Sequence, residues 1–239
     1  MFKDLLAACA TLVFPPHCFL CRKTLVFAPN SCLCSFCQEN LQWNTPPFCV
    51  KCSRHVKSSI NLCANCRSGR IHFDFAYAAL QFNEPLKALL HQYKYQRATA
   101  LRILFADRML RFIQEHQLDM ARFDLIIPVP LHPAALRMRG FNQSLLLAKE
   151  IARHFSIPYS AKALLKIRPT RSQSELKRKE RWTNLTGAFT INHSVRLKGK
   201  NVLLVDDLLT TGATASAAAK ALKNAGCDTV GVLTLAAVT

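Results

Sequence analysis

From residue 71 onward, apolar and polar positions follow two different periods along the chain. Short runs of branched apolar residues predict strands at 75–82, 124–129, 163–167, 201–205 and 229–235. Longer stretches with an apolar stripe predict helices at 85–93, 98–116, 144–155 and 214–225. Strands that alternate with helices in this way predict an α/β fold, in which a mostly parallel sheet carries helices on both faces.

The stretch between the predicted strand 201–205 and the following helix carries the candidate chemistry. Asp206 and Asp207 come directly after the strand, and the turn that leads into the helix consists of Thr210, Thr211, Gly212, Ala213 and Thr214. Ligands of open α/β sheets bind beyond the carboxyl ends of the strands, and a helix N-terminus offers unpaired backbone N–H groups to an anion. The turn is therefore predicted to hold a phosphate. The paired carboxylates are predicted to bind a sugar diol and Mg²⁺.

A phosphate, a diol and Mg²⁺ side by side describe a ribose 5-phosphate that carries a further phosphate group. The stretch resembles the phosphoribosyl pyrophosphate (PRPP) motif of the type I phosphoribosyltransferases, with Ala213 where many members carry a second glycine. The resemblance implies that the acids bind the ribose hydroxyls and that residues 210–214 bind the 5′-phosphate. The alternatives are a strand-turn-helix junction whose acids only cap it, and the acidic pair of a nucleoside triphosphatase.

A second polar stretch follows the predicted strand 124–129. It contains Val129, Pro130, Leu131 and His132, and then Arg137 and Arg139. A loop between a strand and a helix can wrap pyrophosphate with backbone N–H groups, and arginines pair bidentately with phosphate oxygens. We therefore expect this stretch to bind pyrophosphate. The alternative is that both arginines are solvated loop charges.

Residues 168–189 are basic and have few apolar anchors, which predicts a mobile loop. In the type I phosphoribosyltransferases, a flexible loop in this position closes over the bound pyrophosphate. The resemblance extends to Gln173 and Arg181, and Arg178 is a further cation in the segment. Such a lid would exclude water from the reacting sugar and add positive charge near the leaving group. A basic loop that contacts DNA is the alternative.

Cysteines at metal-binding spacing are concentrated near the N-terminus. Ten of the eleven precede residue 67, and most pair as C-x-x-C, a spacing that places two thiolates on one metal. The economical pairing predicts two structural zinc sites, one of Cys18, Cys21, Cys34 and Cys37 and one of Cys49, Cys52, Cys63 and Cys66. The alternatives are an interleaved pairing, an iron–sulfur cluster, or other ligands, namely Cys32, His17 or His55.

The formal net charge of +18 predicts a polyanionic partner, such as nucleic acid, an anionic membrane or a phosphorylated substrate. Residues 1–70 hold eight basic residues against two acids, interleaved with Phe36, Trp43 and Phe48. This combination suits stacking on single-stranded DNA, and a solvated basic surface is the alternative. The apolar run 5–14 could pass for a signal peptide, but Asp4 and the lack of a small-residue cleavage site favour a short amphipathic helix. No later stretch has the length of a membrane span.

Taken together, these motifs resemble the ComF family over nearly the whole chain. The matching strings are the C-x-x-C pairs, residues 90–95 (LHQYKY), 128–130 (PVP), 139–144 (RGFNQS) and the PRPP motif. The resemblance implies a type I phosphoribosyltransferase fold at 71–239, preceded by an N-terminal helix and a double zinc ribbon at 1–70. Within the later part, residues 71–110 would form a hood that binds the acceptor. Lys94 is expected to be a surface lysine beside packed aromatic rings, and the alternative is that it lines the hood.

The family resemblance also implies a function. ComF members are associated with natural transformation, so we expect a cytoplasmic protein that handles imported single-stranded DNA and carries a PRPP site. A competence helicase or another DNA-processing protein is the expected protein partner. The alternative is an active phosphoribosyltransferase of nucleotide or cofactor salvage, with no direct role in DNA binding.

Overall fold

The computed structural model describes residues 16–25, 31–57, 61–169, 182 and 185–238. Its central feature is a four-stranded sheet in the order β1 (Phe75–Gln81), β6 (Thr229–Ala237), β5 (Asn201–Leu209) and β2 (Leu125–Pro128). All neighbouring strands of this sheet are parallel. Almost every residue of β5 and β6 is buried, which explains their nearly continuous apolar sequence.

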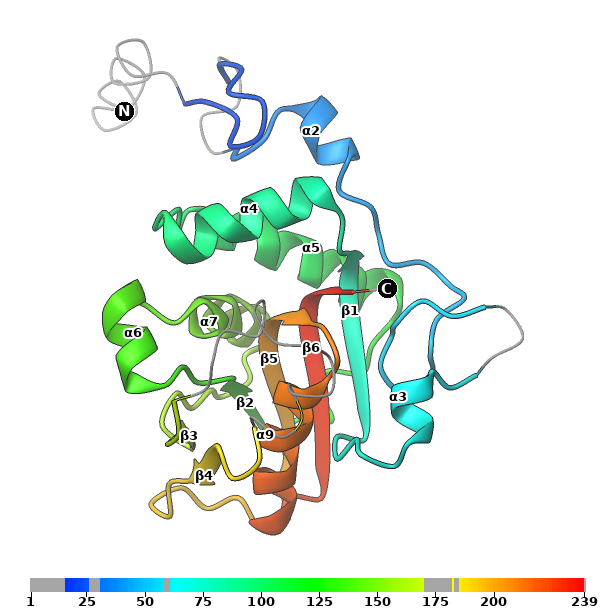
Figure 1. The fold of residues 1–239 in the computed structure, drawn as a ribbon, viewed down its shortest axis with the longest axis vertical. Coiled ribbons are helices and arrows are strands. Elements are labelled where there is room, and N and C mark those ends of the chain that lie inside the picture. Colours follow the sequence, from blue (N-terminus) through cyan, green and yellow to red (C-terminus); the bar gives the residue numbers. More distant parts are fainter. Residues whose placement is uncertain (1–15, 26–30, 58–60, 170–181, 183–184, 239) are drawn as a thin grey trace.

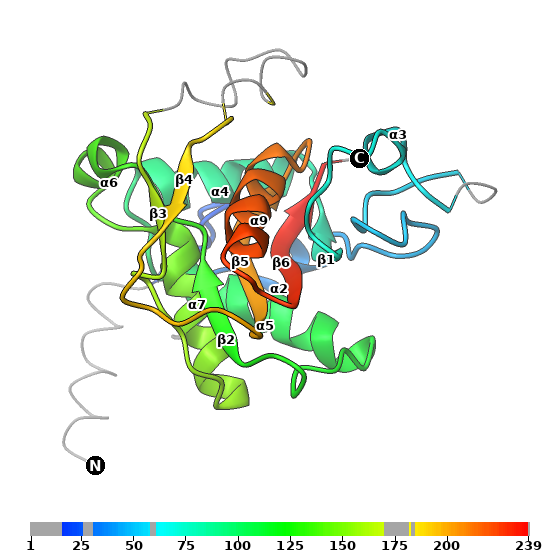
Figure 2. The ribbon, with the colours of Figure 1, turned by 90° about the horizontal axis from the view of Figure 1, so that it is seen from below.

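Helices cover both faces of the sheet, as Figure 2 shows. On one face, α5 (Leu101–Glu115) contacts α7 (Gln143–Phe155), and α7 lies against β5 and β2. On the other face, α9 (Ala213–Asn224) lies against β5 and β6. A further helix, α4 (Glu84–Tyr95), packs on α5 and buries its stripe of leucines there. The sequence period of each predicted helix therefore corresponds to the face that it buries.

One predicted strand does not join the main sheet. The predicted strand 163–167 appears as β3 (Leu164–Lys166), which pairs antiparallel with β4 (Phe189–Ile191) in a separate two-stranded sheet. Leu164 is buried whereas Leu165 is 39% exposed, the one-sided burial of a small ribbon. The outer edge of β2 instead forms a bridge between Ile126 and Tyr159.

The strand that carries the acidic pair is longer than predicted. The sequence places Asp206 and Asp207 beyond a strand that ends at residue 205, but β5 continues through both acids to Leu209. Pairing with β2 does end at Val205, opposite Pro128, whereas pairing with β6 continues to Leu209 opposite Ala237. The acids therefore project beyond the end of one neighbouring strand while the other still holds their backbone.

Two cysteine-rich segments precede the sheet, and one lies beside helices while the other lies beside strand β1, as Figure 1 shows. Ribbon 1 carries Cys18, Cys21, Cys34 and Cys37, includes α2 (Ser35–Glu39), and lies beside α4 and α5. Ribbon 2 carries Cys49, Cys52, Cys63 and Cys66, includes α3 (Ala64–Arg67), and lies beside β1. The predicted helix at 5–14 lies outside the described residues.

Specific hydrogen bonds fasten each ribbon to the rest of the chain. Gln92 Nε2 on α4 donates to the Phe19 carbonyl of ribbon 1 at 2.9 Å. The Ala76 N–H on β1 donates to the Lys51 carbonyl of ribbon 2 at 2.8 Å. Within the described ranges, we find no helix that combines the length and apolarity needed to cross a membrane.

Candidate functional site

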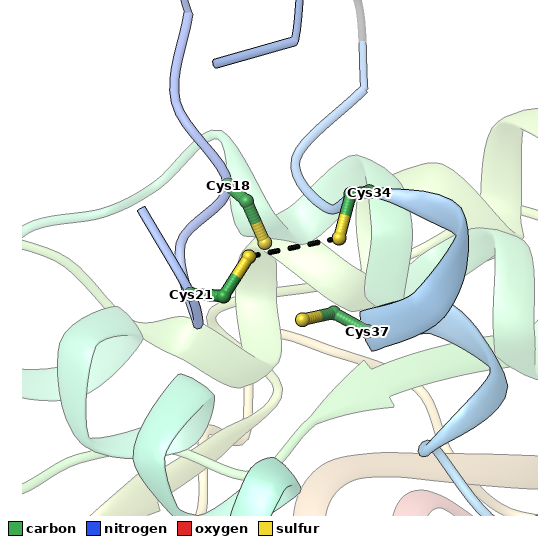
Figure 3. A group of neighbouring side chains, drawn as sticks. All are labelled: Cys18, Cys21, Cys34 and Cys37. Atoms are coloured by element: carbon green, nitrogen blue, oxygen red, sulfur yellow. Dashed lines mark hydrogen bonds between the residues drawn. The ribbon is translucent and has the colours of Figure 1, made fainter. Parts of the chain in front are cut away.

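Each predicted cysteine tetrad forms a compact cluster. The four sulfur atoms of ribbon 1 converge in Figure 3, and in each ribbon all four lie within 4.8 Å of one another. A tetrahedral site with Zn–S distances of about 2.3 Å has sulfur atoms about 3.8 Å apart. The Cys21 and Cys34 sulfurs are 3.7 Å apart, and the Cys52 and Cys63 sulfurs are 3.6 Å apart. The spacing of the thiols therefore fits zinc.

Within ribbon 1, the surroundings of Cys18 favour the thiolate form, whereas burial raises the pKa of Cys37 to about 12. Burial alone would raise the pKa of the Cys18 thiol, but hydrogen bonds from backbone N–H groups, those of Cys21 and Cys34 foremost, lower it to about 6. Among the described residues, the alternative ligands do not join either cluster. Cys32 instead donates to the Ala100 carbonyl, with its sulfur 3.7 Å away, and His17 is exposed.

Asp206 is held in place by two donors. Ser144 Oγ, near the start of α7, donates to Asp206 Oδ1 at 2.7 Å, and the Asp207 N–H donates to the same oxygen at 2.9 Å. Burial, followed by the negative charge of Asp207, raises the pKa of Asp206 to about 7. Burial and repulsion within the pair therefore make Asp206 the more readily protonated of the two acids.

Asp207 is kept ionised by a lysine that the sequence analysis places at the surface. Burial raises the pKa of Asp207, but the ammonium group of Lys94 on α4 outweighs it through an ion pair, and the net shift is downward. The Lys94 side chain is only 19% exposed, so the expected surface position is wrong. Lys94 lies one turn beyond the buried Leu90, at the edge of the apolar stripe of α4, and this spacing is the signal that could have revealed it.

The threonine-rich turn at residues 210–214 leads directly into α9 through a left-handed glycine. We call residues 210–214 the phosphate loop. Gly212 has a φ of +80°, in the left-handed region that favours glycine, and α9 begins directly after it. The Ala213 N–H donates to Thr211 Oγ1 at 3.3 Å. The loop and the positive end of the α9 dipole therefore lie at the same edge of the sheet as the acidic pair.

The stretch predicted to bind pyrophosphate contains a short helix rather than a plain loop. The Ala134 N–H donates to His132 Nδ1 at 3.3 Å, and this cap starts α6 (Pro133–Arg139). Both arginines lie in the last turn of α6, but their side chains point in different directions. Arg137 is exposed to solvent, whereas Arg139 turns inward, stacks over the Tyr95 ring at 5.3 Å and donates to Gln143 Oε1 at 2.5 Å.

Gln143 links this arginine to the acidic pair, because its Nε2 donates to Asp207 Oδ1 at 3.4 Å. At the end of β2, the Val129 N–H donates to the Val205 carbonyl at 2.9 Å, which places Pro130 and Leu131 beside the strand that carries the acids. The structure thus brings together the acids, the phosphate loop, residues 129–132 and Arg139. The predicted lid residues Gln173, Arg178 and Arg181 lie outside the described residues.

Comparison with known families agrees with this geometry. Residues 142–239 match the family described as a phosphoribosyl transferase domain, and residues 9–67 match the double zinc ribbon domain. The fold class predicted from the sequence is therefore confirmed. The two cysteine tetrads, in the context of a zinc-ribbon domain, suggest structural zinc.

Curated relatives match the chain almost from end to end. Competence protein F of Haemophilus influenzae is 32% identical, over 92% of this chain and 96% of the relative. DNA utilization protein YhgH of Escherichia coli O157:H7 is 30% identical over the same shares. Competence protein ComFC of Streptococcus pneumoniae is 29% identical, over 91% of this chain and 98% of the relative. The chain therefore belongs to the ComF family of competence and DNA utilization proteins.

Proposed function

We propose that this chain binds PRPP, or a related ribose 5-phosphate, together with Mg²⁺, and acts on imported single-stranded DNA in natural transformation. One observation carries the sugar-phosphate part: two buried carboxylates lie at the end of β5, next to a left-handed glycine turn that opens α9. This arrangement supplies acceptors for a diol and donors for a phosphate at one edge of the sheet.

The roles follow from the positions of the side chains. Asp206 and Asp207 accept hydrogen bonds from the two ribose hydroxyls, and the phosphate loop donates its N–H groups to the 5′-phosphate. Residues 129–132 and Arg139 bind the pyrophosphate, whose negative charge Mg²⁺ would neutralise. The hard carboxylate oxygens of the acidic pair suit that ion. Lys94 competes with the diol for Asp207, so binding of the sugar requires this ion pair to loosen.

Calorimetric titration with PRPP and Mg²⁺ tests this site. We expect micromolar binding by the native protein and at least a tenfold loss in an Asp206→Asn, Asp207→Asn double variant, because amides accept weakly from hydroxyls and do not attract the cation. Asp228→Asn, which removes an acid away from the site, is the control and should leave the affinity unchanged. A native protein that does not bind PRPP would rule out the proposed sugar-phosphate site.

The DNA part of the proposal is supported by the competence and DNA utilization roles for which the relatives are named, and by the charge of +18. Lysines and arginines that neutralise phosphates release counterions, so the affinity for a single-stranded oligonucleotide should fall steeply as salt is added. Fluorescence anisotropy at several salt concentrations measures this slope. A complex whose affinity does not change with salt would contradict electrostatic binding of DNA.

Turnover of PRPP is the second candidate function. It is favoured by the chain of contacts from Arg139 through Gln143 to Asp207, which places a cation beside the proposed diol site, where a departing pyrophosphate needs one. Release of pyrophosphate in the presence of a set of nucleobases would establish transfer. Tight binding of PRPP without release under these conditions would favour a binding role in DNA uptake.

A further inference from the structure

Ribbon 2 contacts the phosphate loop through two polar side chains, each of which lies next to one of its two cysteine pairs in the sequence. Arg54, two residues after Cys52, donates from Nη2 to the Thr210 carbonyl. Asn65, which lies between Cys63 and Cys66 on α3, donates from Nδ2 to the Thr211 carbonyl at 2.9 Å. Two consecutive carbonyl groups of the loop are therefore directed toward ribbon 2.

Because the peptide group is planar, fixing these two carbonyls also fixes the directions of the N–H groups that would bind the phosphate. In a trans peptide, the carbonyl and the following N–H point in opposite directions. Fixing the carbonyls of Thr210 and Thr211 toward ribbon 2 thus turns the N–H groups of Thr211 and Gly212 away from it. Within the described ranges, neither N–H donates to another residue. The same contacts also keep the partial negative charges of the two carbonyl oxygens away from the side of the loop that would bind the phosphate.

The segment that leaves ribbon 2 supports the same loop from a second side. A Cβ atom on Gly212 would lie 3.4 Å from Ile71 Cδ1, so this isoleucine closes the space behind the turn. Ser216, in the first turns of α9, donates from Oγ to the Arg70 carbonyl at 2.7 Å and accepts from the His72 N–H at 3.1 Å. The loop and the start of α9 thus both contact residues 70–72, which lead from ribbon 2 into the sheet domain.

Ribbon 2 is itself fixed to the sheet, so it can act as a rigid support. Ser53 Oγ donates to the Ala76 carbonyl on β1 at 2.7 Å, and Asn44 Nδ2 donates to the Ser53 carbonyl at 2.8 Å. Arg54 and Ser53 directly follow Cys52, and the Cys49 N–H donates to the Arg54 carbonyl at 2.7 Å. The conformation of the turn that carries Cys49 and Cys52 therefore fixes the backbone position of Arg54, from which its side chain extends toward the loop.

From these contacts we infer that Arg54 and Asn65 are positioning residues, through which ribbon 2 holds the phosphate loop in its phosphate-binding conformation. This inference rests on the proposed sugar-phosphate function. It assigns to the second cysteine cluster an effect on ligand affinity that the first cluster, which contacts α4 and α5, does not share.

Titration of the zinc-loaded full-length protein with ribose 5-phosphate tests the inference. We expect the affinity to fall about tenfold in Arg54→Gln, whose shorter side chain brings no donor within reach of the Thr210 carbonyl, and in Asn65→Asp, whose carboxylate has no donor for the Thr211 carbonyl. Arg54→Lys keeps a donor and should recover part of the loss. Arg67→Gln and Asn61→Asp make matched changes at exposed positions of ribbon 2 and should bind as tightly as the native protein.

A second measurement separates positioning from general destabilisation. The amide nitrogen and proton shifts of Thr211 and Gly212 should move in the Arg54 and Asn65 variants before any ligand is added, at unchanged zinc content and melting temperature. Variants that keep both the native affinity and the native amide shifts would overturn the inference while leaving the proposed function intact. A native protein that fails to bind ribose 5-phosphate and PRPP would overturn both.

Discussion

A Cys63→Ser variant is expected to hold about one zinc equivalent per chain where the native protein holds about two. A serine hydroxyl is a poor substitute for a thiolate, and structural Cys₄ sites supply about 10–16 kcal/mol of metal-binding free energy that a ribbon needs in order to fold. Elemental analysis of the purified protein measures the stoichiometry. Because ribbon 2 supports the phosphate loop, the affinity for ribose 5-phosphate should also fall more than tenfold.

Cys21→Ser is the matched variant in ribbon 1. It should likewise remove about one zinc equivalent. Its ribbon, however, is hydrogen-bonded to Gln92 on α4 and to Arg108 on α5 rather than to residues of the phosphate loop. We therefore expect its affinity for ribose 5-phosphate to stay within about threefold of native. Equal losses of affinity in the two variants would contradict a specific link between ribbon 2 and the loop. Two zinc equivalents retained in Cys63→Ser would contradict the proposed ligand set.

A Lys94→Met variant is expected to lose about 3 kcal/mol of unfolding free energy at pH 8, because removing one partner of a buried ion pair leaves the other charge uncompensated. Lys94 and Asp207 are 19% and 5% exposed in their side chains, so water screens this pair little. Without the lysine, burial is left as the largest influence on Asp207, and we expect it to raise the pKa of this carboxyl above its ordinary value near 3.9.

The sign of the pH dependence follows from that shift. A carboxyl with a higher pKa in the folded state than in the unfolded state binds its proton more tightly when folded, so the free energy of unfolding falls as the pH rises. Because the lysine lowers the pKa of Asp207 in the native protein, part of the Lys94→Met deficit should already be present near pH 5, and the deficit should grow toward pH 8. Urea denaturation at several pH values measures it.

Lys87→Met on the same helix is the control for Lys94→Met. Lys87 pairs with Glu84, but these side chains are 59% and 85% exposed, and exposed pairs contribute at most about 1 kcal/mol. We expect a small loss for this variant that does not change between pH 6 and 8. A Lys94→Met deficit of the same size at pH 5 and pH 8 would show that lost packing, rather than the charge on Asp207, causes the instability.

The sequence by itself determined the parts of this protein whose chemistry is local. A C-x-x-C spacing places two thiols on one metal, so the spacing predicted the four cysteine pairs, whereas the structure decided which pairs share a cluster. The same holds for the turn at residues 210–214, where a glycine in the left-handed region and a helix start are encoded within a few residues. Strand and helix periods likewise predicted the α/β fold.

The tertiary structure alone decided which distant groups meet. Lys94 reaches Asp207 across 113 positions of sequence, and Asn65 reaches Thr211 across 146. The length of β5 depended on its neighbours, because β6 continues past the acids while β2 stops at Pro128. Such contacts depend on how helices and ribbons pack on the sheet, and a side chain carries no local signal of the partner that packing brings to it. The sequence thus determined which groups could bind a sugar phosphate, and packing determined which groups hold them in place.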